Sequence, residues 1–156
     1  MPITARFGAQ GQWLFKIEKQ ENISLTVTEE FTQSCSSILT PVRVASASNE
    51  NEMYEAMALW DTGSVYSGIS KSLAERMGLK PLSWKQRVDY ADGESREENV
   101  YHIHIAFPPS GRRADICAFE FRDDGQDIII GMNIIRNGRF LLEPTDERGV
   151  RFTFTL

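Results

Sequence analysis

The amino-acid sequence predicts a mainly β fold in a single domain. From residue 23 onward, short apolar segments recur along the chain, several of them alternating with polar residues, and polar turn residues separate them. Start and stop signals of a helix coincide in one segment only. The 156 residues, 41% of them hydrophobic, suffice for one compact core and are too few for two large domains. We therefore expect one β-rich domain with one or two short helices.

The first strands follow an N-terminal segment with no clear hydrophobic period. Residues 1–30 are interpreted as an arm or an extra strand, with a first strand candidate at 23–27. Apolar segments at 38–45 and 53–60 are the next strand candidates. The stretch 46–52 between them is rich in Ser and Asn, which favour turns, so these two strands are expected to pair antiparallel.

A helix is predicted to begin at residue 70 or 72 and to end at residue 77. Ser72 and Glu75 have the spacing of a capping box at a helix start. Gly78 stands where a helix-ending glycine is expected, and Pro81 prevents the helix from resuming.

A second hairpin is predicted after this helix. Its strands are expected at 87–90 and 100–107, and its exposed tip at the polar turn Ala91-Asp92-Gly93-Glu94. The remaining strands are expected at 115–121, 127–130, 139–143 and 150–156.

One acidic residue stands where an apolar strand meets a glycine turn. Asp61 directly follows Ala58-Leu59-Trp60, and Gly63 lies two positions later. A carboxylate at a strand end is held on a rigid part of the fold. The glycine lets the backbone turn sharply, so that amide N–H groups approach the carboxylate and hold it ionised, while Thr62 and Ser64 supply hydroxyls to the same network. This pattern suits catalysis, and it is also found in plain strand-ending turns.

Three motifs together resemble the retropepsin-like aspartic proteases, the group of retroviral and DNA-damage-inducible-type single-domain enzymes. They are Asp61-Thr62-Gly63-Ser64, the Asp92-Gly93 hairpin tip, and Asp127-Ile128-Ile129-Ile130-Gly131. An Asp-Thr-Gly tripeptide alone is a weak signal, and the later Ile-Ile-Gly at a spacing that leaves room for a hairpin strengthens it. The resemblance implies a closed β-barrel over residues 31–156. Met132-Asn133 departs from the retroviral pattern, so the arginine-centred dimer contact of those enzymes is not expected here.

The resemblance also implies roles for individual residues. It implies that the catalytic tripeptide is Asp61, Thr62 and Gly63. It implies that the active site is supported by Ser64, Ile129, Ile130 and Gly131. It implies that a flap over the substrate contains Tyr90, Ala91, Asp92 and Gly93.

A two-fold homodimer follows from the number of carboxylates that the chemistry needs. One carboxylate acts as base toward the attacking water while the other donates a proton to the scissile carbonyl. The sequence contains one Asp-Thr-Gly and no Asp-Ser-Gly, so a second copy must supply the second Asp61. We therefore expect an aspartic endopeptidase that acts on polypeptides without a cofactor or a metal.

A second hypothesis is a catalytically silent module that keeps the retropepsin fold for dimerisation or for peptide binding, because a fold does not guarantee an activity. The intact Asp61-Thr62-Gly63-Ser64 argues against it. Asp61 carboxylates within hydrogen-bonding reach across a two-fold axis would favour the enzyme, and an isolated Asp61 would favour the module.

The charge and hydropathy of the chain argue against two classes of partner. The formal net charge of −5 disfavours non-specific binding to nucleic acid, which normally needs a basic face. No uninterrupted hydrophobic run is long enough for a membrane span, and the first twenty residues lack the apolar core of a signal peptide. We expect no nucleic-acid or membrane partner and a cytoplasmic location, although a removed signal would leave no trace.

The histidines and cysteines have simple interpretations. His102 and His104 lie two apart on a predicted strand and could share a metal, but no third ligand is apparent and the solvent side of the strand is the expected place for both. Cys35 and Cys117 form no ligand cluster, which favours two free thiols over a disulfide.

Overall fold

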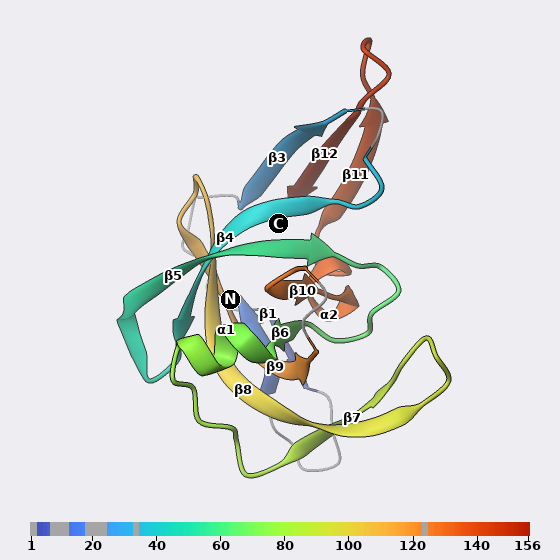
Figure 1. The fold of residues 1–156 in the computed structure, drawn as a ribbon. Coiled ribbons are helices and arrows are strands. Elements are labelled where there is room, and N and C mark those ends of the chain that lie inside the picture. Colours follow the sequence, from blue (N-terminus) through green and yellow to red (C-terminus); the bar gives the residue numbers. More distant parts are fainter. Residues whose placement is uncertain (1–2, 7–12, 18–24, 33–34, 123–124) are drawn as a thin grey trace.

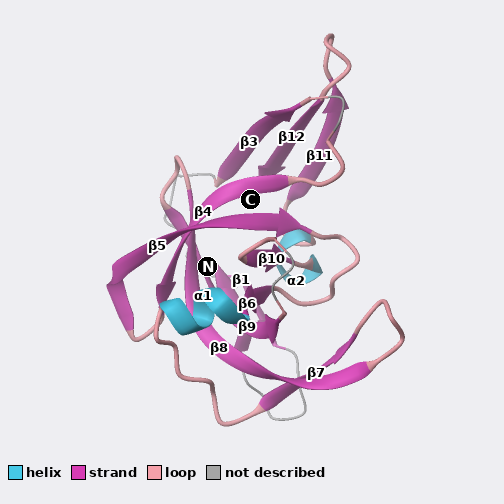
Figure 2. Ribbon diagram, viewed as in Figure 1, coloured by secondary structure: helices cyan, strands magenta, loops and turns pink. Residues whose placement is uncertain are grey.

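The structure, a computed structural model, describes residues 3–6, 13–17, 25–32, 35–122 and 125–156. Strands make up most of this part of the chain, and its two helices are short (Figure 2). The elements are β1 Ile3–Arg6, β2 Trp13–Ile17, β3 Thr26–Phe31, β4 Leu39–Ser46, β5 Asn49–Trp60, β6 Gly68–Ser70, α1 Lys71–Arg76, β7 Lys85–Asp89, β8 Ser95–Phe107, β9 Arg112–Phe121, β10 Ile128–Ile130, α2 Met132–Ile135, β11 Arg139–Pro144 and β12 Val150–Thr155. The predicted mainly β fold with short helices is confirmed.

Six strands form a closed circuit of hydrogen-bonded neighbours. Their order is β9-β6-β10-β5-β4-β8, and β8 pairs back with β9 over its whole apolar half. β7 extends the circuit beyond β8, and β2 followed by β1 extends it beyond β9. Residues 1–30 thus include two strands of the larger sheet, β1 and β2, and most of β3. β9 and β10 come last in the sequence among these six strands. β9 joins β8 to β6, and β10 joins β6 to β5, so these two strands complete the circuit.

The apolar half of β8 supplies a large part of this core. From Val100 to Phe107 only His102 is exposed, and Tyr101, Ile103, Ile105 and Phe107, which share one face of the strand, are all buried. Val100, His104 and Ala106 on the opposite face are buried as well, so this half of β8 is covered on both sides. The core is completed mainly by aliphatic side chains of β4, β9 and β10.

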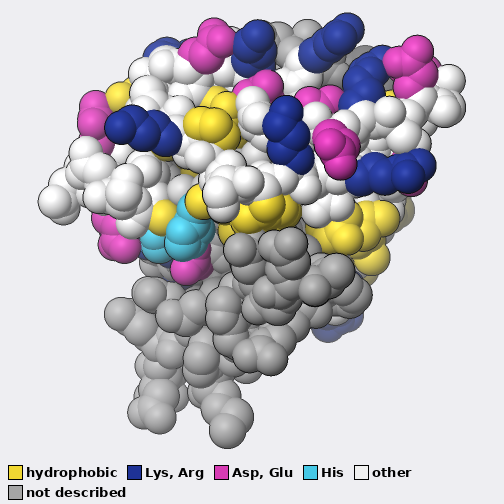
Figure 3. All heavy atoms as spheres, turned by 90° about the horizontal axis from the view of Figure 1, so that it is seen from below, with side chains coloured by type: hydrophobic (Ala, Val, Ile, Leu, Met, Phe, Trp, Pro, Cys, Tyr) yellow, Lys and Arg dark blue, Asp and Glu magenta, His cyan; other side chains and the backbone are white. Residues whose placement is uncertain are grey.

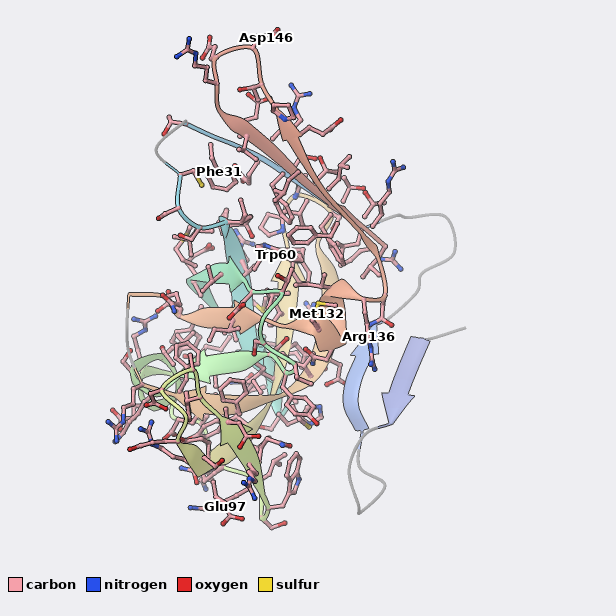
Figure 4. All side chains as sticks on the ribbon, turned by 90° about the vertical axis from the view of Figure 1, so that its right-hand side faces the viewer. Phe31, Trp60, Glu97, Met132, Arg136 and Asp146 are labelled. Carbon is pink, nitrogen blue, oxygen red and sulfur yellow. The ribbon has the colours of Figure 1, made fainter. Side chains whose placement is uncertain are left out.

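A separate three-stranded sheet, with the order β11-β12-β3, stands at one end of the molecule (Figure 1). Phe152 and Phe154 of β12 are fully buried, and their ring centroids lie 5.0 Å and 4.8 Å from that of Trp60. Figure 4 places Trp60 at the junction between this sheet and the strands of the circuit. Part of the predicted strand 23–27 lies outside the described residues, and the described strand runs further along the chain, to Phe31.

Helix α1 follows β6 directly and begins at the earlier of the two serines considered. Ser70 is the N-cap, because its backbone is still extended and its Oγ accepts a hydrogen bond from the Leu73 N–H at 3.2 Å. The expected capping box of Ser72 and Glu75 is therefore wrong, since Ser72 already lies in the first turn. Gly78 ends the helix as predicted, with φ +62°. Neither helix of the described part is long and apolar enough to cross a membrane.

Candidate active site

Asp61 lies at the end of β5, where two strands from distant parts of the chain run side by side. β5 and β10 pair in parallel, with Ala58 opposite Ile128 and Trp60 opposite Ile130. The Asp61 N–H donates a hydrogen bond to the Ile130 carbonyl at 2.9 Å. The start of the Asp-Thr-Gly motif is therefore held by a buried strand, because Ile130 is fully buried.

The Asp61 carboxylate receives a hydrogen bond from the turn that follows it. The Gly63 N–H donates to Oδ1 at 2.8 Å, as the sequence predicted for an amide brought close by a glycine. A Cβ atom on Gly63 would lie 3.2 Å from the same oxygen, so glycine gives the carboxylate room. Asp61 is partly exposed, and Thr62 and Gly63 are exposed. The site is thus an open edge of the single chain.

The two hydroxyls of the motif do not contact this carboxylate, which corrects the sequence-based prediction. Ser64 Oγ donates instead to the Tyr66 carbonyl at 2.7 Å, so this hydroxyl closes the loop behind Asp61. No hydrogen bond of the Thr62 hydroxyl occurs within the described residues. Among the described groups, the Asp61 carboxylate therefore relies on the Gly63 amide alone.

The Asp61 loop is locked onto the segment around Gly131. The Met132 N–H donates to the Ser64 carbonyl at 2.8 Å, and the Asn133 N–H donates to the Val65 carbonyl at 3.0 Å. A Cβ on Gly131 would lie 2.3 Å from the Tyr66 carbonyl oxygen, so only glycine fits between the two segments. The structure thus brings together the two glycine motifs that the sequence singled out, and Ile129 and Ile130 lie in the strand leading to Gly131.

Ser67 is a supporting residue that the sequence did not mark. It is fully buried, its Oγ accepts a hydrogen bond from the Gly131 N–H at 3.0 Å, and it donates to Asn133 Oδ1 at 2.8 Å. Asp127 begins the third sequence motif, but its contact was not predicted: its Oδ2 accepts a hydrogen bond from the Met57 N–H at 3.0 Å. A serine near a turn carries no sequence signal that separates it from an ordinary loop residue.

The predicted second hairpin is formed by β7 and β8, paired antiparallel from Lys85–Asn99 to Asp89–Ser95. The Gly93 N–H donates to the Tyr90 carbonyl at 3.0 Å, and Gly93 has φ +84°, which favours glycine. Ala91, Asp92 and Gly93 are exposed, and Tyr90 is partly buried. In Figure 1 this hairpin extends on the same side of the molecule as the loop between β5 and β6, which contains Asp61. The structure shows no hydrogen bond between the hairpin and that loop within the described residues.

Tyr90 is held in its neutral form. Partial burial raises the pKa of its phenol to about 12, and the hydrogen bond to Glu98 acts in the same direction. The Tyr90 hydroxyl therefore keeps its proton at physiological pH and donates it to Glu98 Oε1 at 2.9 Å.

The histidine prediction is half wrong. His102 lies on the solvent side as expected and pairs with Asp115, and this hydrogen bond raises the His102 pKa above its usual value. His104 is only 8% exposed and lies beside Glu50 at the start of β5, with 3.5 Å between His104 Nε2 and Glu50 Oε1. Figure 3 shows histidine surface bordered by acidic side chains. No group of three potential metal ligands occurs in the part of the chain that the structure describes.

The two cysteines are free thiols, as the sequence favoured. Burial raises the pKa of the Cys117 thiol to about 11, so it stays protonated and is a poor nucleophile at neutral pH. Neither cysteine belongs to the Asp61 site.

A closed circuit of short strands, with an Asp-Thr-Gly loop locked onto an Ile-Ile-Gly strand, defines the retropepsin-like class of fold. Residues 40–134 match the profile of a family described as aspartyl protease. Since this match covers more than half of the chain and includes Asp61 and Gly131, the chain belongs to the aspartyl protease family.

Comparison with a solved structure supports this fold. A retropepsin-like aspartic protease from Rickettsia conorii aligns with a TM-score of 0.51 and 10% identity, over 88% of this chain and 98% of that chain. The retroviral protease-like domain of Ddi1 from Leishmania major aligns with a TM-score of 0.43 and 18% identity, over 76% of this chain and 94% of that chain. No curated protein matched the sequence.

Proposed function

We propose that this chain is an aspartic endopeptidase in which two copies each contribute Asp61 to one shared active site. The observation that carries the proposal is the setting of the Asp61 carboxylate. It stands at the rigid end of β5, accepts one backbone hydrogen bond, and faces an open edge of a chain that belongs to the aspartyl protease family.

The geometry of the loop suits general acid–base chemistry. The Gly63 amide occupies Asp61 Oδ1, and Oδ2 carries no hydrogen bond within the described residues, which leaves it available to a water molecule. In the proposed dimer the ionised carboxylate takes a proton from this water as its oxygen attacks the carbonyl carbon, and the protonated partner carboxyl donates to the carbonyl oxygen. The carboxyl that took the water proton then protonates the amide nitrogen, and a hydroxyl of the tetrahedral intermediate gives its proton to the other carboxylate. The C–N bond breaks, and the pair again holds one ionised and one protonated carboxyl.

The surface around Asp61 supports a shared rather than a single-chain site. Thr62 and Gly63 are exposed, and Val65 in the same loop is 64% exposed, which is high for an apolar side chain next to a catalytic motif. A second copy docked on this edge would cover these residues and bring its own Asp61 to the first. The same arrangement supplies the second carboxylate that the chemistry requires.

The substrate in this proposal is an extended polypeptide. The hairpin of β7 and β8 would close over it, with main-chain hydrogen bonds for grip and alternate side-chain pockets for preference. Residues Tyr90 to Gly93 form the tip that would contact the substrate.

A mixing experiment with Asp61→Asn tests the shared site directly. The variant alone should keep its fold and lose peptidase activity, because the dimer loses both carboxylates at once. When equal amounts of wild-type and variant chains re-equilibrate, about one quarter of random dimers contain two wild-type chains. Activity should therefore fall to about one quarter of the wild-type value, whereas independent single-chain sites would retain about one half.

The outcomes separate the alternatives. Activity that falls only in proportion to the wild-type fraction would contradict the shared site. A folded Asp61→Asn protein that cleaves peptides as well as the wild type would remove Asp61 from catalysis. A wild-type dimer without activity on any polypeptide would instead favour the silent dimerisation or peptide-binding module.

A further inference from the structure

Polar side chains brace the β7–β8 hairpin around its tip. Arg96 contacts Glu94 and lies 3.3 Å from Asp92 Oδ2, and its guanidinium carbon lies 4.9 Å from the centroid of the Tyr90 ring. Tyr90 in turn donates to Glu98 across the hairpin. Together these contacts connect the turn to both strands, so the hairpin is built to move as one stiff unit.

A stiff hairpin turns where it joins the body of the protein. The Leu82 N–H donates to the Val100 carbonyl at 2.7 Å, directly before β7 begins. Two residues further along β8, the His102 carbonyl accepts from the Ala47 N–H of the β4–β5 turn at 3.1 Å. This short part of β8 therefore ties the hairpin base to two separate segments, and we call it the hairpin pivot (residues 82, 47 and 100–102).

A pocket of about 680 Å³ opens at this pivot. Its volume lies in the range of small-molecule sites. Its walls come from the β4–β5 turn, from the end of α1 with the loop that follows, and from Tyr101 and His102 of β8. Asn49, Glu52 and Tyr54 of β5 line this pocket, and Asp61 follows the other end of the same strand, so the pocket is separate from the candidate active site.

The pocket combines an apolar wall with a polar rim. Met77, Leu79 and Tyr54 line it and pack against the core, and Leu82 adds a further apolar side chain. The apolar part of a ligand can therefore move from water into this pocket without a rearrangement of the core.

The side chains of the rim that can still form hydrogen bonds to a ligand are mainly donors. Each oxygen of the Glu52 carboxylate already accepts one hydrogen bond, Oε1 from the Tyr54 hydroxyl at 2.7 Å and Oε2 from Asn49 Nδ2 at 3.3 Å. Lys80 lines the pocket and is exposed, and no ion pair of its ammonium group occurs within the described residues. His102 Nε2 is occupied by Asp115, which leaves Nδ1 of this imidazole. The ammonium group of Lys80 therefore complements an anionic group on a ligand.

We propose that this pocket binds a small organic molecule with an apolar body and one carboxylate, and that the bound molecule restrains the hairpin pivot. The ligand would bridge the β4–β5 turn and the loop after α1, the two segments that hold β8 at the pivot. The binding site stands by itself, whereas its effect on catalysis rests on the proposed endopeptidase function.

Three naphthalene probes test the ligand class. They share an apolar body and differ in the head group: 1-naphthaleneacetate, the neutral 1-naphthaleneethanol and the cationic 2-(1-naphthyl)ethylamine. Titrations followed by NMR chemical shifts should locate 1-naphthaleneacetate at the pocket residues, with the tightest binding of the three. Equal affinity for all three probes would overturn the carboxylate assignment, and shift changes elsewhere or nowhere would overturn the site.

Variants show which wall makes each contact. Lys80→Gln should weaken 1-naphthaleneacetate about two- to fivefold, the range of an exposed ion pair, and leave the alcohol unchanged. Lys71→Gln is the matched control, because this lysine lies on α1 outside the pocket. Leu82→Ala should weaken all three probes. An equal loss for the acid and the alcohol in Lys80→Gln would contradict the proposed ion pair.

Hydrogen exchange measures the restraint without any need for catalysis. At ten times the Kd, a ligand that binds only the closed pivot should slow exchange of the Leu82 and Ala47 amides about tenfold. The Leu156 amide, which is bonded to the Leu25 carbonyl at 2.9 Å beside the three-stranded sheet, should not change. Unchanged pivot exchange with the probe bound would overturn the restraint. If the restraint holds, the probe should lower peptidase kcat/KM in the wild type and much less in Leu82→Ala. An inactive chain would contradict the proposed function and leave the exchange result standing.

Discussion

The Asp61 loop and the β7–β8 hairpin are held together in opposite ways. Around Asp61, backbone groups from two distant segments hydrogen-bond each other, and Gly131 lies so close to Tyr66 that no side chain fits. At the hairpin tip the contacts are made by charged side chains at the surface, and no atom lies within 4 Å of a Cβ added at Gly93.

This difference indicates how each region serves an enzyme of the proposed kind. Buried backbone contacts keep reacting groups in one place, because protein interiors are close-packed and resist small displacements. The ion pairs at the hairpin tip join residues of the hairpin to one another, and within the described residues no hydrogen bond ties the hairpin to the Asp61 loop, so the hairpin can move against that loop at low cost. We expect substitutions near Asp61 to change folding stability and substitutions at the hairpin to change turnover.

The largest effect is expected from Trp60, which connects the strand of Asp61 to the three-stranded sheet. Trp60→Ala removes ring contacts with Phe152 and Phe154 and leaves a cavity, which should cost about 4 kcal/mol of unfolding free energy. Trp84→Ala is the matched control, because Trp84 at the hairpin base is only partly buried and should cost about 1 kcal/mol. Denaturant titrations measure both, and equal costs would break the comparison.

A smaller loss of stability is expected from Gly131→Ala. The new Cβ would lie 2.3 Å from the Tyr66 carbonyl oxygen, so the two segments must separate, at about 3 kcal/mol. For a domain of this size the thermal midpoint should fall by about 6 to 12 °C. Gly93→Ala strains a positive φ in open space and should cost about 1 kcal/mol. A Gly131→Ala protein as stable as Gly93→Ala would show that the loop is less tightly packed than the structure indicates.

Turnover should respond at the hairpin instead. Gly93→Val strains the tip and alters how the hairpin closes, so kcat/KM should fall severalfold while the thermal midpoint changes by a few degrees. Gly111→Val provides the control, because Gly111 has φ +66° and open space in the β8–β9 turn. It should lose similar stability and keep its turnover. Equal kcat/KM in both variants, or a loss explained by unfolding, would remove the flap assignment.

The smallest effect is a pH dependence at the exposed pair of His102 and Asp115. The His102 pKa is raised in the folded state, so the pair stabilises the protein fully below the unfolded-state pKa near 6.5 and loses this contribution as pH rises through the folded-state value. Wild type should exceed Asp115→Asn in stability more at pH 5.5 than at pH 8.5, by about 0.5 kcal/mol or less, because His102 is half exposed. A difference that grows with pH would reverse the assigned sign.

Local patterns were enough to predict most of the fold. The apolar residues at 100–107 predicted a strand, and Gly78 and Gly93 marked turns, because these features depend on residues close together in the chain. The start of the helix at Ser70 was less certain, since two serines in sequence had suitable positions and the preceding strand decides which one caps.

Hydrogen-bond partners near the site were predicted less well. The hydroxyl of Ser64 was expected at Asp61 and lies at Tyr66, because the loop folds back toward Gly131. Ser67 had no signal at all, since its role depends on a strand more than sixty positions away in the sequence.

The sequence by itself determined that the chain is mainly β, that an Asp-Thr-Gly follows a buried strand, and that a glycine-tipped hairpin stands between it and the Ile-Ile-Gly. Only the tertiary structure decided that β10 runs beside β5, that Glu50 lies beside His104, and that a pocket lies at the hairpin pivot. The physical reason is the range of the interactions. Strand alternation and turn chemistry act between neighbours in the chain, whereas burial and pocket walls depend on segments that meet only when the circuit of strands has closed.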